Sequence, residues 1–293
     1  MSLLAACPWA FVAVAAAFGL VVGSFLNVVI HRLPIVLERQ WRAQAAEAEG
    51  RAAPAPGEPY NLVHPRSRCP ACNAQIRAIH NVPLLSWLAL RGRCASCRAP
   101  ISMRYPLVEL ATGAAFAAVA WHFGFGWQAA LGLVFTGYLV ALTGIDVDRQ
   151  LLPDLLTLPL LWIGLLASLW PGPAGIAPPV SPADAVAGAA AGYLFLWLVF
   201  QLFRLITGKE GMGYGDFKLF GAIGAWLGWQ MLPLVLMLSA VVGAVVGLLL
   251  IATRRQGRGV PMPFGPYLAG AGWVAMLWGP QIVDRYLGIA GLR

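Results

Sequence analysis

Two aspartates lie at the edges of apolar segments, where an ionised side chain is costly and is therefore a candidate for function. Asp146 ends an apolar run within the sequence TGIDVDR, and Asp216 precedes another run within the sequence GMGYGDFK. Two carboxyl groups brought together there can share one proton, because like-charge repulsion and partial desolvation oppose double ionisation. Such a pair suits aspartyl-protease chemistry: one carboxylate accepts a proton from water, and the protonated partner donates a hydrogen bond to the scissile carbonyl.

Structural roles for the same residues remain alternatives. A charge at the end of a membrane span can set topology, which would account for Asp146, and Asp216 can cap the helix that follows it. Asp148 and Asp154 are expected in a solvated turn, where Asp154 follows Pro153 and is a candidate cap for the next helix.

Two further charged residues lie in or next to apolar runs, and neither belongs to a recognisable catalytic motif. Glu109 lies inside an apolar run, five residues after Arg104, and is either the ion-pair partner of that arginine or part of a site. Lys218 is either a neighbour of the aspartate pair or an ordinary interfacial lysine. The residues alone do not decide between these roles.

Four cysteines form two Cys-x-x-Cys pairs with 21 residues between them, namely Cys69, Cys72, Cys94 and Cys97. This spacing is typical of a tetrahedral zinc site with four thiolate ligands. Four thiolates close the coordination sphere, so the metal would be structural and would hold together a segment too small for a core of its own. Disulfides are the alternative, but they are rare in the cytoplasm.

Composition identifies the elements that must position these residues. Of 293 residues, 59% are hydrophobic and 11% charged, and the mean hydropathy is +0.73, which excludes a single water-soluble core. A membrane span needs about 20 predominantly apolar residues. Eight apolar runs predict an all-α polytopic membrane protein with about eight transmembrane helices, or seven, because the sixth run is short. The runs are Trp9–Ile30, Tyr105–Phe123, Trp127–Ile145, Leu155–Trp170, Ala185–Ile206, Leu219–Trp229, Leu232–Ala252 and Phe264–Ile282.

The distribution of basic residues predicts the orientation. The segment His31–Arg104 holds 11 of the 20 Lys and Arg residues, which places it in the cytoplasm. Alternating the spans then puts Asp146 and Asp216 at the cytoplasmic face and the N-terminus in the periplasm. Only Arg285 and Arg293 fall on the other side. The net charge of +8 is therefore a topology signal, and no motif accompanies it that would indicate nucleic-acid binding.

Three parts follow from these boundaries: a first transmembrane helix at 1–30, a small cytoplasmic zinc-binding insert between the first two helices at 31–103, and a membrane core of about seven helices at 104–293. Within the insert, residues 38–59 are rich in Ala, Glu and Arg and then in Pro. This composition predicts a short amphipathic helix and a linker, to which no role is assigned.

The chain resembles the type IV prepilin peptidases, the bifunctional leader peptidase/N-methyltransferases of type IV pilus and type II secretion systems. Besides the two cysteine pairs, the matching segments are GLVVGSFLNVVIHRLP, RYPLVELATG, IDVDRQLLPD and GMGYGDFK, in the family's order across most of the chain. By this resemblance Asp146 and Asp216 are the catalytic aspartates of a membrane protease with a Gly-x-Gly-Asp motif. The four cysteines correspond to the family's zinc ligands.

The resemblance also implies substrates, cofactors and location. The family cleaves the basic leader of prepilins and pseudopilins after a glycine, at the cytoplasmic face of the bacterial inner membrane, and methylates the new N-terminal residue with S-adenosylmethionine. No glycine-rich loop marks the methyl-donor site, so its residues stay unassigned, as do the particular pilins and the oligomeric state. A peptidase without methyl transfer, or an ion-conducting role for the carboxylates, remains an alternative. A transporter, however, is expected to show internal repeats, and the sequence shows none.

Overall fold

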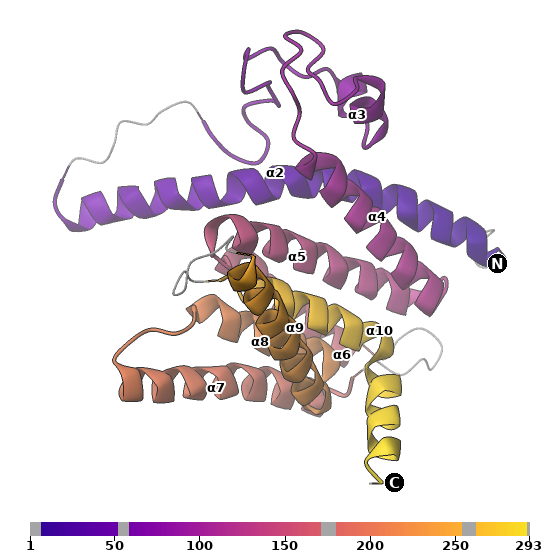
Figure 1. Cartoon of the computed structure of the whole chain (residues 1–293), viewed down its shortest axis with the longest axis vertical. Helices are drawn as coiled ribbons and strands as arrows, with labels where there is room; N and C mark the ends of the chain where they lie inside the picture. The colour runs from indigo at the N-terminus through magenta and orange to yellow at the C-terminus, as the bar shows by residue number, and fades with distance from the viewer. Residues whose placement is uncertain (1–6, 52–58, 171–179, 254–261, 292–293) are drawn as a thin grey trace. The chain divides into compact units, whose positions relative to one another are not determined.

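The structure is a computed structural model that describes residues 7–51, 59–170, 180–253 and 262–291 (Figure 1). Over these ranges it is helical, with two isolated β-bridges and no strand, as the all-α prediction requires. The basic cluster Arg254–Arg258, which entered the orientation argument, lies outside the described residues.

The chain divides into two compact units, Met1–Ala129 and Ala130–Arg293. The first unit contains α2 (Pro8–Ala48), η1 (Ala78–Asn81), α3 (Leu85–Ala89), α4 (Arg104–Phe123) and the first residues of α5 (Trp127–Arg149). The second unit contains the rest of α5, then α6 (Asp154–Leu169), α7 (Pro182–Thr207), α8 (Tyr214–Leu227), η3 (Trp229–Met231), α9 (Leu232–Ala252) and α10 (Gly265–Ile289). The three-part division expected from the sequence stays a prediction.

Each of the eight apolar runs lies on a helix of the structure, and together they make a multi-pass membrane protein. Five helical segments among the described residues are long and apolar enough to cross a membrane: α2, α4, α5, α7 and the segment Trp229–Ala252 that includes α9. The apolar helix α6 has 16 residues and α8 has 14, both short of the roughly 20 needed to span a bilayer.

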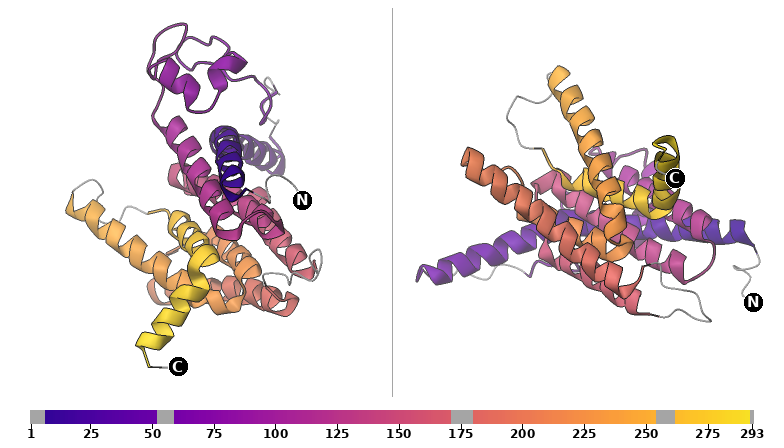
Figure 2. Two further views of the ribbon diagram at one scale, coloured as in Figure 1. Left: turned by 90° about the vertical axis from the view of Figure 1, so that its right-hand side faces the viewer. Right: turned by 90° about the horizontal axis from the view of Figure 1, so that it is seen from below.

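The first helix is much longer than expected. Instead of ending near Ile30, α2 continues for 41 residues, with Pro34 inside it, and it includes the Ala/Glu/Arg-rich stretch as far as Ala48 (Figures 1 and 2). The short separate helix predicted for this stretch is therefore the end of α2. Residues of these types are strong helix formers, and extending an existing helix costs less than nucleating a new one.

In the first unit α2 packs along α4 through small residues. A Cβ at Gly19 would lie 2.9 Å from the Gly113 Cα, so the two backbones touch here. Nearer the insert, the Asn27 amide donates a hydrogen bond of 3.1 Å to the Tyr105 carbonyl, which fixes the start of α4 against α2.

In the second unit α8 is the central helix. Residues on all sides of it are buried, and it packs against α6, α7 and α10. A helix that is apolar all round is stable only when surrounded in this way. Trp226 fixes its far end, because its indole N–H donates to the Leu160 carbonyl of α6 at 2.7 Å. Asp216 therefore lies at the N-terminal end of the most buried helix of the unit.

The contact between α7 and α8 depends on two glycines. A Cβ at Gly188 would collide with the Gly224 carbonyl, and a Cβ at Gly224 would collide with the Gly188 carbonyl. Close backbone contact through small residues is a main source of helix association in membranes. Gly188 and Gly192 on α7, and Gly224 and Gly228 at the end of α8, are small residues four apart, a spacing that allows such packing.

We predict that Gly224→Ala lowers the free energy of unfolding by about 1–3 kcal/mol, because the added methyl group forces the helices apart. Gly137→Ala on α5 is the control, since a Cβ there meets nothing within 4 Å. Thermal unfolding in detergent should give a Tm lower by about 2–10 °C for Gly224→Ala and no decrease for Gly137→Ala. Equal Tm values for the two variants would contradict this packing.

Candidate functional site

The structure brings the two predicted aspartates together in the second unit. Asp146 lies in the last turn of α5 and Asp216 in the first turn of α8, with side chains 5% and 7% exposed. Their carboxyl groups are close enough for a Coulombic interaction. Two buried carboxyl groups that face like charge oppose double ionisation, and the single shared proton expected from the sequence stays a prediction.

Backbone amides hold both carboxyl groups. The Gly265 N–H, at the start of α10, donates to Asp146 Oδ2 at 2.9 Å. The Gly213 N–H, at the N-cap of α8, donates to the Asp216 carboxyl. An acidic side chain that bonds back to the N-cap amide also stabilises the helix end, so the capping role considered for Asp216 is compatible with a chemical one.

Glycines let the backbone approach this site. A Cβ at Gly215 would lie 2.6 Å from Leu152 Cβ, so α8 can begin next to the α5–α6 connection only because this residue has no side chain. Gly265 was not among the candidate residues from the sequence. Its signal there is weak: a Gly-Pro pair at the start of the last apolar run, which is common where a helix begins.

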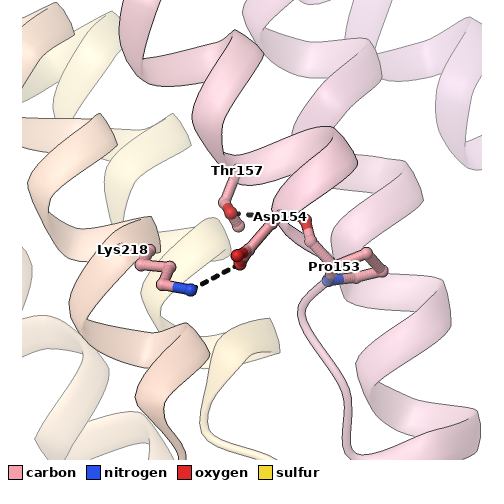
Figure 3. A network of polar contacts seen from close by, with 4 residues as sticks. All are labelled: Pro153, Asp154, Thr157 and Lys218. Carbon is pink, nitrogen blue, oxygen red and sulfur yellow. Dashed lines mark hydrogen bonds and ion pairs between the residues drawn. The ribbon is translucent and has the colours of Figure 1, made fainter. Parts of the chain in front are cut away.

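Lys218 and Asp154 form an ion pair beside the aspartates. Lys218 Nζ lies 2.6 Å from Asp154 Oδ1 and links the second turn of α8 to the first residue of α6 (Figure 3). The side chains are 29% and 56% exposed, so the pair contributes at most about 1 kcal/mol. Pro153 occupies the N-cap of α6 with no side-chain cap bond, so the proposed capping by Asp154 is wrong. Asp148 is exposed, as expected for a residue near the turn.

The four cysteines of the first unit form one cluster. Their sulfur atoms all lie within 4.8 Å of one another, and Cys69 Sγ is 3.8 Å from Cys97 Sγ. Tetrahedral zinc with Zn–S bonds of about 2.3 Å places sulfur pairs about 3.8 Å apart. The donor set and its spacing therefore fit a metal ion with four thiolate ligands.

The two cysteine loops have the same backbone geometry. In each loop the residue after the second cysteine is left-handed, with φ of 56° at Asn73 and 62° at Arg98, and its N–H donates to the carbonyl of the first cysteine. Hydrogen bonds from the backbone N–H groups of Cys97 and Ser96 lower the pKa of the Cys94 thiol to about 6. The neighbouring Cys97 thiol shifts the other way, because hydrogen bonding to the Cys72 thiol raises its pKa to about 11, so these shifts alone do not favour four thiolates.

Glu109 connects α4 to the insert. Its side chain is 8% exposed, and Oε2 accepts a 2.8 Å hydrogen bond from the Leu84 N–H. Leu84 has φ 57° and ψ −49°, a backbone conformation that few non-glycine residues adopt. The N–H of Leu85 donates to the Pro83 carbonyl at 2.6 Å, so the chain makes a tight three-residue turn here. The carboxylate holds this turn, a role that the sequence reasoning did not include.

Comparison with known families matches each unit separately. The bacterial peptidase A24 N-terminal domain matches residues 17–123, and the type IV leader peptidase family matches residues 133–248. The first match contains the cysteine cluster and Glu109. The second contains both aspartates and the Gly-x-Gly-Asp sequence.

Curated relatives match over nearly the whole length. A prepilin leader peptidase/N-methyltransferase of Stutzerimonas stutzeri is 57% identical over 289 residues, covering 99% of this chain and 98% of its own. The protein of the same description from Pseudomonas aeruginosa is 55% identical over 290 residues, with coverage of 99% and 98%. One from Aeromonas hydrophila is 56% identical over 285 residues, with coverage of 96% and 95%. No solved structure matches the chain.

We predict that the purified protein contains one metal ion per chain and that Cys72→Ser releases it, because one of four thiolate ligands is lost. The insert should then unfold at a lower temperature, since metal binding supplies much of the folding free energy of such a small segment. Cys7→Ser is the matched control, because Cys7 is exposed and lies outside the cluster. Elemental analysis of both variants checks the prediction, and a full equivalent of metal in Cys72→Ser would refute the four-thiolate site.

Proposed function

The chain belongs to the type IV leader peptidase family, and from this premise we propose that Asp146 and Asp216 carry out its peptidase reaction. The enzyme removes the leader peptide of prepilins and N-methylates the new N-terminal residue. The observation that carries the proposal is the pair of buried, interacting carboxyl groups in the unit that matches the leader peptidase family. These are the only two aspartates that are buried among the described residues.

The reaction follows from a pair that holds one proton. The ionised carboxylate accepts a proton from a water molecule, whose oxygen attacks the carbonyl carbon of the scissile peptide bond. The protonated partner donates a hydrogen bond to the carbonyl oxygen, where negative charge develops. When the C–N bond breaks, the departing nitrogen takes up a proton, and the products are the leader acid and a free amine on the mature pilin.

The substrates in this proposal are type IV prepilins and related pseudopilins, cut after a glycine at the cytoplasmic face of the bacterial inner membrane. Support for the location comes from the helix ends: α5 ends and α8 begins at the site, so both carboxyl groups lie at one end of their helices. The excess of basic residues in the insert favours the cytoplasm for that end.

We assign zinc to the four-cysteine cluster as a structural ion. The tetrahedral spacing of the sulfur atoms and the purely thiolate donor set favour zinc over harder cations. With all four positions taken by Cys69, Cys72, Cys94 and Cys97, the ion has no open position for water. Its contribution would be to fold the insert.

For methyl transfer we assign the methyl donor, S-adenosylmethionine, to a cleft of the same insert. The cleft has a volume of about 680 Å³ and is lined by Val63, Arg66, Ser67, Gln75, Ile76, Arg77 and Asn81. Two guanidinium groups fit the donor's carboxylate, because arginine binds carboxylates with two parallel hydrogen bonds. When bound, the donor supplies an electrophilic methyl group, and the insert would orient it toward the free amine of the cleaved pilin.

We expect Asp146→Asn and Asp216→Asn each to slow prepilin cleavage by at least about 10²–10⁴-fold, the usual range for losing a general acid or base. Asp148→Asn is the control, because it removes an exposed carboxylate from the same turn of α5. Cleavage is followed by mass spectrometry of a purified prepilin, and thermal unfolding in detergent checks that each variant is folded. Cleavage within a few-fold of the wild-type rate in either buried variant would rule out the pair.

We expect Arg66→Ala combined with Arg77→Ala to raise the KM for S-adenosylmethionine at least about tenfold and to leave leader cleavage unchanged, because the variant loses only the carboxylate partners in the cleft. Arg42→Ala, a charge change at an exposed residue of α2 outside the cleft, should not affect either activity. Initial rates of methylation of a pre-cleaved pilin provide the measurement. An unaltered KM in the double variant would exclude this cleft.

A further inference from the structure

We propose that Gly265 is a positioning residue for the peptidase reaction: its backbone N–H, at the start of α10, fixes the Asp146 carboxylate relative to Asp216. The inference rests on the proposed function, which makes these two aspartates the reacting pair. It adds a third helix to the site, because neither carboxylate is on α10.

The first observation is the hydrogen bond itself. The Gly265 N–H reaches Asp146 Oδ2 at 2.9 Å, in a buried environment, across 119 residues of sequence. A bond to one oxygen fixes the plane of the carboxyl group and leaves the other oxygen for water or for the partner carboxyl. A buried hydrogen bond to a carboxyl group is strong enough to hold one rotamer.

The second observation is that the start of α10 needs an outside acceptor. Phe264 at the N-cap makes no side-chain cap bond. Its carbonyl accepts hydrogen bonds from the N–H groups of Tyr267 and Leu268, at 3.1 and 3.2 Å. Pro266 has no N–H. Gly265, the first helical residue, therefore carries an N–H that has no acceptor within its own helix, and Asp146 accepts from it. The partial positive charge of the helix end favours the same contact.

The third observation is that this position has room only for glycine. A Cβ on Gly265 would lie 2.6 Å from Asp146 Oδ2 and 3.2 Å from Leu152 Cδ2. Leu152 cannot move away freely, because its other side is in contact with Gly215, next to Asp216. Any side chain at position 265 must therefore displace the Asp146 carboxylate or move α10.

A small displacement is enough to matter for the chemistry. Reacting groups must be held within about 0.5 Å of their productive geometry, and a misplacement of about 1 Å can cost about 10²-fold in rate. An interaction that positions a reacting group acts on the transition state, so its loss lowers kcat without a matching change in KM. We therefore expect Gly265→Ala to lower kcat for leader cleavage by about 10²-fold and to leave KM within about twofold.

The matched control is Gly270→Ala on the same helix, where a Cβ meets nothing within 4 Å. It should cleave prepilin at the wild-type rate. Both variants should methylate a pre-cleaved pilin normally, and thermal unfolding in detergent checks that Gly265→Ala is folded. If kcat for cleavage is unchanged in Gly265→Ala, the positioning role is wrong. If Asp146→Asn also cleaves normally, the proposed function itself has failed, so the two failures are distinguishable.

A second measurement does not depend on a variant of Gly265. Hydrogen–deuterium exchange of the segment 262–268 should be faster in Asp146→Ala than in the wild type, because the Gly265 amide loses its acceptor. Asp148→Ala should leave that exchange unchanged. Equal exchange in Asp146→Ala and the wild type would show that the bond does not form in solution, and would overturn the proposal even if Gly265→Ala does not fold.

Discussion

Burying two carboxyl groups among apolar helices is the constraint on which the second unit depends. A buried carboxylate is costly unless hydrogen bonds replace its lost water, and helix N-termini are a ready source of unpaired N–H groups. Here α8 provides one such end at Gly213, and α10 provides another at Gly265. The glycines in these two turns allow the backbone close enough to donate. The aspartates thus lie at helix ends because the middle of a span offers no free amides.

The two units meet different physical requirements. In the second unit α8 is surrounded by other helices, so a rigid apolar scaffold supports the carboxyl groups at its N-terminal end. The insert of the first unit buries little apolar surface, since Cys69 is the only buried apolar side chain described between residues 59 and 103. Glu109 ties the tight turn of the insert to α4, and a metal ion bound by the four cysteines would connect its two loops. We infer that each unit supports one of the two reactions, cleavage in the second and methyl transfer in the first.

Much of the fold and of the candidate site could be predicted from residue type and spacing. The apolar runs correspond to helices, the cysteine spacing corresponds to the cluster, and the alternation of spans puts Asp146 and Asp216 at the same end. Three features could not be predicted, for physical reasons. The donor from Gly265 is a backbone group, which every non-proline residue carries, and the left-handed Leu84 has no sequence signature. The continuation of α2 through Pro34 reflects strong helix formers on either side outweighing a residue that usually ends a helix.

The most direct test of the account is intact-mass spectrometry of Asp216→Asn incubated with S-adenosylmethionine and an equal mixture of prepilin and pre-cleaved pilin. If the units support separate reactions, the prepilin keeps its full mass while the pre-cleaved pilin gains one methyl group. The wild-type protein run in parallel converts both to the same methylated product. Loss of the leader in the variant would contradict the aspartate pair, and loss of methylation together with cleavage would contradict the separation of the two sites.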